Sequence, residues 1–204
     1  MSLQIKPASI PLFGNGNFFL CSMKRIIIQL LLCICVNAGY GQIVGISAEM
    51  EERLKAMEGL SLEVYMDGLY RAVGYGHRIT ERDPEWVYDL EHYDEITEET
   101  AEILFRLDMI HLVSPGLEVV RREIGGHYPS NVYDAMGSLI YNMGLEGLRS
   151  TEFYRLFRDG QHQEAFRLLL ATKAEKEGLL ERRYMELSVL VRNYDYSKGK
   201  YMSD

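Results

Sequence analysis

Residues 57–77 read MEGLSLEVYMDGLYRAVGYGH, and they place two acidic residues, Glu58 and Asp67, on either side of an expected helix end and first strand. The Asp67-Gly68 pair is a strong hairpin signal, so short strands are expected over 62–65 and 70–75. The second strand runs into a glycine-rich segment that closes on His77. Most of the remaining chain follows helical spacing, and we expect those helices to brace this segment.

The helices around this segment have recognisable ends. Residues 46–57 begin near a candidate N-cap, Ser47, and stop at Gly59. Further helices are expected from Thr97 to 112, from Ser114-Pro115 onward, and over 129–144, 151–159, 161–171 and 179–192. The helix over 129–144 has a wide apolar stripe, which indicates a central, buried position. The pattern predicts an α+β fold, in which a small β-hairpin lobe and a larger helical lobe enclose a cleft.

The first 41 residues differ from the rest because they contain no Asp or Glu. Met23-Lys24-Arg25 precedes an apolar run over 26–36, and Gly39 and Gly41 stand at the −3 and −1 positions of a cleavage site. These are the parts of a secretory signal peptide, and the run is short for a transmembrane helix. We therefore expect an upstream extension over 1–22, a signal peptide over 23–41, the folded domain over 42–194 and a disordered tail over 195–204. The alternative is an uncleaved N-terminal anchor.

Export would place the protein in the periplasm or outside the cell, without its cysteines. All three cysteines precede residue 42, so the mature chain would have no disulfide and no thiol nucleophile. Loss of the three basic residues in this part leaves 19 Lys and Arg against 30 Asp and Glu, a net charge of −11. This charge argues against a nucleic-acid partner. The five histidines lack metal-ligand spacing, so neither a metal nor another cofactor is expected.

The acidic pair suggests one kind of chemistry. Cleavage of a glycosidic bond needs one protonated and one ionised carboxyl group on opposite sides of the sugar. Glu58, at a helix end among apolar residues, suits the acid, and Asp67, in an open turn, suits the ionised partner. On spacing alone, a surface carboxylate at Glu58 and a turn residue at Asp67 are the better explanation, because acidic residues are common in this chain.

The stretch also resembles the phage-type lysozymes of glycoside hydrolase family 24, the muramidase endolysins. Their signature is a Glu-Gly at the end of the first helix, an Asp after eight intervening residues, and a strand reading Thr-Ile-Gly-Tyr-Gly-His. Here Glu58-Gly59 and Asp67 precede Ala-Val-Gly-Tyr-Gly-His over 72–77. The resemblance continues in order through 96–108, 134–144, 150–165 and 178–186.

The resemblance implies a secreted muramidase that acts on peptidoglycan, with Glu58 as general acid and Asp67 as base or electrostatic stabiliser. Tyr75 and Asn142 are candidate sugar-binding residues, with core packing and helix capping as their alternatives. Further residues are expected to support the structure. His77 would pair with Asp108, with a role as base as the alternative. Arg182 and Arg183 would form ion pairs that fix the last helix against the first, with cations of the pocket as the alternative. We expect a monomer.

Two departures from the family pattern bear on activity. The turn after Asp67 is one residue shorter, and Ala72 stands where the family has a threonine that helps to hold the attacking water. Alanine has no hydroxyl group and cannot orient a water molecule. A non-catalytic peptidoglycan-binding module on the same fold is therefore the alternative function. The other departure is an extended segment over 82–95, which would either cover the cleft or only enlarge a loop.

Overall fold

The structure is a computed structural model that describes residues 45–172 and 178–202. All of them belong to one compact unit, Ile43–Asp204. The expected extension over 1–22 and signal peptide over 23–41 lie outside the described residues. Within the described ranges, no helix is both long enough and apolar enough to cross a membrane.

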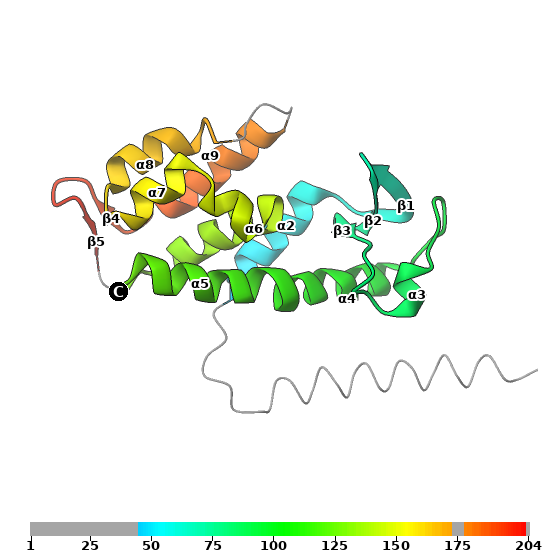
Figure 1. Cartoon of the computed structure of the whole chain (residues 1–204). Coiled ribbons are helices and arrows are strands. Elements are labelled where there is room, and N and C mark those ends of the chain that lie inside the picture. Colours follow the sequence, from blue (N-terminus) through cyan, green and yellow to red (C-terminus); the bar gives the residue numbers. More distant parts are fainter. Residues whose placement is uncertain (1–44, 173–177, 203–204) are drawn as a thin grey trace, which may run out of the picture. The chain divides into compact units, whose positions relative to one another are not determined.

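The described chain is α+β, as predicted (Figure 1). One sheet contains the strands β1 (Ser61–Asp67), β2 (Tyr70–Gly74) and β3 (His77–Arg78). A second sheet contains the strands β4 (Tyr194–Asp195) and β5 (Lys200–Tyr201). Its helices are α2 (Ala48–Glu58), α3 (Glu85–Tyr88), α4 (Glu98–Asp108), η1 (Met109–Val113), α5 (Ser114–Ile124), α6 (Ser130–Arg149), α7 (Glu152–Arg158), α8 (His162–Leu169) and α9 (Leu179–Leu190).

Helix α2 is fixed at both ends by the residues that the sequence indicates. The Ser47 hydroxyl accepts a hydrogen bond from the backbone N–H of Met50 at 3.2 Å, and so caps the helix. The backbone N–H and the hydroxyl of Ser47 also donate to the carboxylate of Asp134 in α6, at 2.6 and 2.9 Å. Gly59, with φ +72°, ends the helix directly after Glu58. These contacts hold Glu58 at the edge of the helical lobe.

The predicted hairpin is part of a three-stranded antiparallel sheet in the order β1-β2-β3. Asp67 pairs with Tyr70 around the turn, where Gly68 takes the left-handed φ of +61°. The short strand β3 adds His77 opposite Val73. Because the sheet packs against α4, it holds Asp67 beside the cleft described below.

The extended segment over 82–95 mostly covers the edge of the sheet. After α3 the chain returns beside β1 and bonds to its backbone. The N–H of Tyr93 donates to the carbonyl of Val64 at 3.1 Å, and the N–H of Val64 donates to the carbonyl of Asp94 at 2.9 Å. Val87 joins a small core beneath the sheet, and Trp86 packs against this core. The segment therefore shields an otherwise open strand edge, and only its beginning reaches the cleft.

A helical break at Ser114, expected from Pro115, is absent from the structure. Helices α4, η1 and α5 follow one another without interruption and form one long rod in Figure 1. The π-helical turn η1 ends at Val113, two residues before Pro115, and the N–H of Ser114 donates to the carbonyl of Met109. The wider turn accommodates proline, which lacks an N–H donor, without ending the helix.

The main core lies in the helical lobe around α6. Val132, Met136 and Leu139 are fully buried there, as the wide apolar stripe predicts. Gly144 interrupts α6 with φ +72°, at the position where the sequence indicated a stop. The residues just before this kink point to the sheet lobe and line the cleft.

The prediction of a disordered tail over 195–204 is wrong for its described part. Tyr194 pairs with Tyr201 in the β4–β5 hairpin, although the segment is polar overall. The reason is aromatic packing, since both tyrosines contact the ring of His162, with centroids 5.8 and 5.5 Å apart. Burial in this cluster lowers the pKa of His162.

Candidate active site

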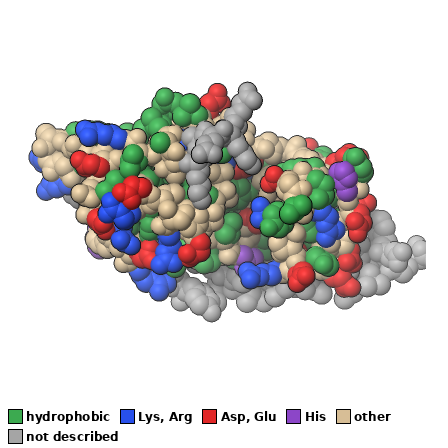
Figure 2. Space-filling view, turned by 45° about the horizontal axis from the view of Figure 1, so that its top comes forward, with side chains coloured by type: hydrophobic (Ala, Val, Ile, Leu, Met, Phe, Trp, Pro, Cys, Tyr) green, Lys and Arg blue, Asp and Glu red, His purple; other side chains and the backbone are tan. Residues whose placement is uncertain are grey.

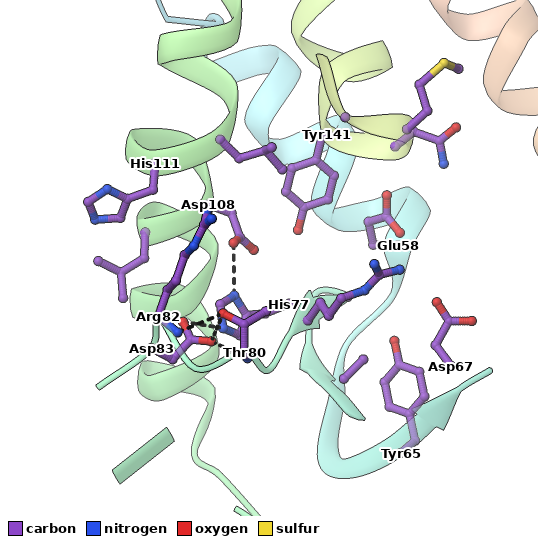
Figure 3. Close-up of a pocket in the computed structure, with 18 of the residues that line it drawn as sticks. Glu58, Tyr65, Asp67, His77, Thr80, Arg82, Asp83, Asp108, His111 and Tyr141 are labelled. Atoms are coloured by element: carbon purple, nitrogen blue, oxygen red, sulfur yellow. Dashed lines mark hydrogen bonds and ion pairs between the residues drawn. The ribbon is translucent and has the colours of Figure 1, made fainter. Parts of the chain in front are cut away.

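A cleft of about 1080 Å³ lies where the sheet, the rod and the kink of α6 meet (Figure 3). Both carboxyl groups singled out in the sequence, Glu58 and Asp67, line it. The cleft is large enough for a segment of polymer. Figure 2 shows acidic and basic side chains interspersed over the helical lobe.

Glu58 enters the cleft from the last position of α2. Its Oε1 forms an ion pair with Nη1 of Arg182 from α9, and its side chain is 23% exposed. The other oxygen, Oε2, faces Gly76, where an added Cβ would lie only 3.5 Å away. Gly76 also has φ +83°, so both its conformation and its lack of a side chain suit this close approach.

Asp67 has a different environment, because it is the last residue of β1 and is exposed to solvent. In Figure 3 its carboxylate points into the same space as that of Glu58. The site thus contains one half-buried, ion-paired carboxyl group and one open carboxyl group. Glycosidic cleavage needs a pair of carboxyl groups at one site.

His77 lies at one side of the cleft between two carboxylates. Its Nδ1 lies 3.0 Å from Oδ1 of Asp108, the predicted partner, and its Nε2 lies 3.2 Å from Oδ1 of Asp83. Burial alone would lower the pKa of His77, but hydrogen bonding and charge from Asp108, together with Asp83, outweigh burial and raise it. The arrangement holds the loop after β3 against α4.

Because this pKa is raised in the folded state, the pair should stabilise the protein below the pKa of an unfolded histidine, about 6.5. The stabilisation is lost as the pH rises through the folded-state pKa. Asp108→Asn is expected to lower the free energy of unfolding at pH 6 by about 1.5–3 kcal/mol, and by less at pH 9. Urea denaturation at both pH values measures this, and an equal loss at both would contradict the ion pair.

Arg182 and Arg183 form ion pairs and hydrogen bonds with different partners. Arg183 is fully buried, pairs with Glu186 through Nη1, and donates from Nε to the carbonyl of Thr172 at 2.9 Å. Arg182 joins Glu186 to Glu58, and its Nη2 donates to the carbonyl of Ser138 at 3.1 Å. The ion pair expected between the last helix and the first is therefore made by Arg182, whereas Arg183 bonds within α9, to Thr172 and to Asn142 of α6.

The two candidate sugar-binding residues differ in position. Asn142 lines the cleft, where its Oδ1 accepts a hydrogen bond from Arg183. Tyr75, by contrast, is not part of the cleft lining, and its hydroxyl donates to Glu102 on α4 at 3.0 Å. The reason is the left-handed φ of both Gly74 and Gly76, which breaks strand alternation around Tyr75. The expectation that Tyr75 binds sugar is therefore wrong in this geometry.

The cleft lining also contains residues that were not predicted as site residues, among them Tyr65, Asp83 and Tyr141. Tyr141 donates its hydroxyl to the backbone carbonyl of Tyr75 at 2.6 Å, and burial raises its pKa. Strand alternation could have placed Tyr65 beside Asp67, because residues two apart share a face. Within the described ranges, no group of three His, Cys, Asp or Glu side chains could hold a metal ion.

The fold and the site together define a lysozyme-like protein, with an acidic pair in a cleft between a small sheet and a helical lobe. The chain belongs to the phage lysozyme family, whose model matches residues 55–186. At the family level, this membership makes it a peptidoglycan hydrolase. A search of curated protein sequences finds no match.

Solved structures agree with this assignment. The muramidase domain of SpmX from Asticaccaulis excentricus has 26% sequence identity and a TM-score of 0.57, over 72% of this chain and 97% of that chain. The endolysin from Escherichia coli O157:H7 phage FAHEc1 has 25% identity and a TM-score of 0.55, over 76% and 97%. A mutant lysozyme of P22 has 25% identity and a TM-score of 0.54, over 72% and 98%.

Proposed function

We propose that the protein is an exported muramidase, which hydrolyses the β-1,4 bond between N-acetylmuramic acid and N-acetylglucosamine in peptidoglycan. Glu58 donates a proton to the leaving oxygen, and Asp67 is the second carboxylate. The observation that carries the proposal is that these two carboxyl groups line one cleft. Family membership supports the same reaction class.

The protein acts as a monomer without a cofactor, and peptidoglycan is its partner. Its acidic balance, −8 for the whole chain, gives little non-specific attraction to anionic wall polymers. Weak non-specific binding to the wall suits an enzyme that opens the wall locally. The endolysin among the similar structures supports a wall substrate.

Export rests on the signal peptide over 23–41 and remains part of the proposal. The mature chain would then begin at Gln42. Sequencing the N-terminus of the exported protein tests this point, and a start far from Gln42 would refute the cleavage site.

The second candidate is a binding module that holds peptidoglycan without cutting it. The observation that favours it is Ala72, which lies on β2 in the cleft lining and lacks the family hydroxyl. Incubating the purified protein with isolated peptidoglycan separates the two functions. Release of soluble fragments supports the muramidase, whereas co-sedimentation without release supports the binding module.

A further inference from the structure

Three cleft residues form a row across the sheet. Tyr65 on β1 pairs with Ala72 on β2, and Ala72 pairs with Arg78 on β3. Directly opposed residues in a sheet point to the same face, and all three line the cleft. Ala72 is only 3% exposed, whereas Tyr65 is 36% exposed. The residue that presents a hydroxyl group to the cleft in this row, next to the position of the missing hydroxyl, is therefore Tyr65.

The phenol of Tyr65 faces both carboxyl groups. Asp67 lies two residues further along β1 and thus on the same face. Figure 3 shows the hydroxyl directed towards the space in front of Asp67 and Glu58. Burial, followed by the negative charges of Asp67 and Glu58, raises the pKa of Tyr65. The hydroxyl therefore keeps its proton at neutral pH and can both donate and accept.

The other hydroxyl groups in the described cleft lining are committed elsewhere. Tyr141 donates to the carbonyl of Tyr75, and the Thr80 hydroxyl bonds to Asp83 at 3.0 Å. Within the described part of the chain, the Tyr65 hydroxyl has no protein hydrogen-bond partner. Arg78 carries only donors, and its guanidinium lies 3.8 Å from the ring centroid of Tyr70.

We propose that Tyr65 is a catalytic residue that holds the attacking water through its phenol oxygen, in place of the hydroxyl absent at Ala72. This inference rests on the proposed function. The water oxygen bonds to C1 of the N-acetylmuramic acid unit as the bond from C1 to the leaving oxygen breaks. Glu58 gives its proton to that oxygen, and Asp67 takes one proton from the water. The second water hydrogen bonds to Tyr65, which keeps its own proton.

The test is Tyr65→Phe, which removes only the hydroxyl, with Tyr70→Phe as the matched control. Tyr70 lies on the same sheet but outside the cleft lining. We expect kcat on soluble glycan strands to fall about 10- to 100-fold in Tyr65→Phe, with KM and the melting temperature unchanged. Tyr70→Phe should retain the kcat of the unmodified protein.

The outcomes separate this inference from the proposed function. If the unmodified protein cleaves glycan and Tyr65→Phe keeps its kcat, the role of Tyr65 is refuted while the muramidase stands. If the unmodified protein releases no reducing ends, the proposed function fails, and the role of Tyr65 fails with it. A fall in kcat accompanied by an equal loss of folded protein would show a structural role and would also overturn the inference.

Discussion

Glu58→Gln is expected to lower kcat/KM for glycan hydrolysis by about 10²–10⁴-fold, the usual contribution of a positioned general acid. Glutamine has nearly the same size and still accepts a hydrogen bond from Arg182, but it has no carboxyl proton to donate. The side chain is half-buried at a helix end, so the fold should persist. The rate of reducing-end release from purified peptidoglycan measures the effect.

The matched control is Glu51→Gln on the same helix, away from the cleft. It removes the same charge and should leave kcat/KM unchanged. Circular dichroism of both variants checks that helix content is preserved. Undiminished activity in Glu58→Gln would show that another group donates the proton and would remove Glu58 from its assigned role.

The largest effect on stability is expected from Glu186→Gln. The carboxylate of Glu186 is fully buried between two buried guanidinium groups, those of Arg182 and Arg183. It also accepts a hydrogen bond from the Ser138 hydroxyl at 2.7 Å. Removing its charge leaves two buried cations without their shared partner, which costs roughly 3–5 kcal/mol. That is a large part of the total stability of an ordinary domain.

Urea denaturation of the unmodified protein and of Glu186→Gln measures this loss of stability. Glu181→Gln, an exposed position on the same helix, is the control and should change the free energy of unfolding by less than about 0.5 kcal/mol. A loss below about 1 kcal/mol in Glu186→Gln would mean that the buried network contributes little. Because Arg182 also pairs with Glu58, the variant should in addition lose activity.

Much of the fold was predictable because its signals are local. The cap at Ser47, the stop at Gly59 and the Asp67-Gly68 turn each depend on neighbouring residues, and the structure confirms all three. The end of α4 was not predictable in this way, because Pro115 signals a break that the π-helical turn avoids. The β4–β5 hairpin was missed because its aromatic partners lie in distant helices.

The candidate site, like the fold, was predictable only in part. The acidic pair and the contact between His77 and Asp108 follow from the resemblance to the phage-type lysozymes, although the catalytic roles stay predictions. The partner of Glu58 lies 124 positions away in α9, so no local pattern indicates it. The second carboxylate beside His77 comes from the irregular loop before α3. The orientation of Tyr75 depends on backbone angles at two glycines, which residue spacing does not reveal.

The central claim is that the protein cleaves the bond after N-acetylmuramic acid by means of Glu58. The most direct measurement is mass spectrometry of the fragments released from isolated peptidoglycan by the purified protein and by Glu58→Gln. We predict muropeptides with reducing N-acetylmuramic acid ends from the first and none from the second. Reducing N-acetylglucosamine ends, equal release by both proteins, or no release by either would contradict the account.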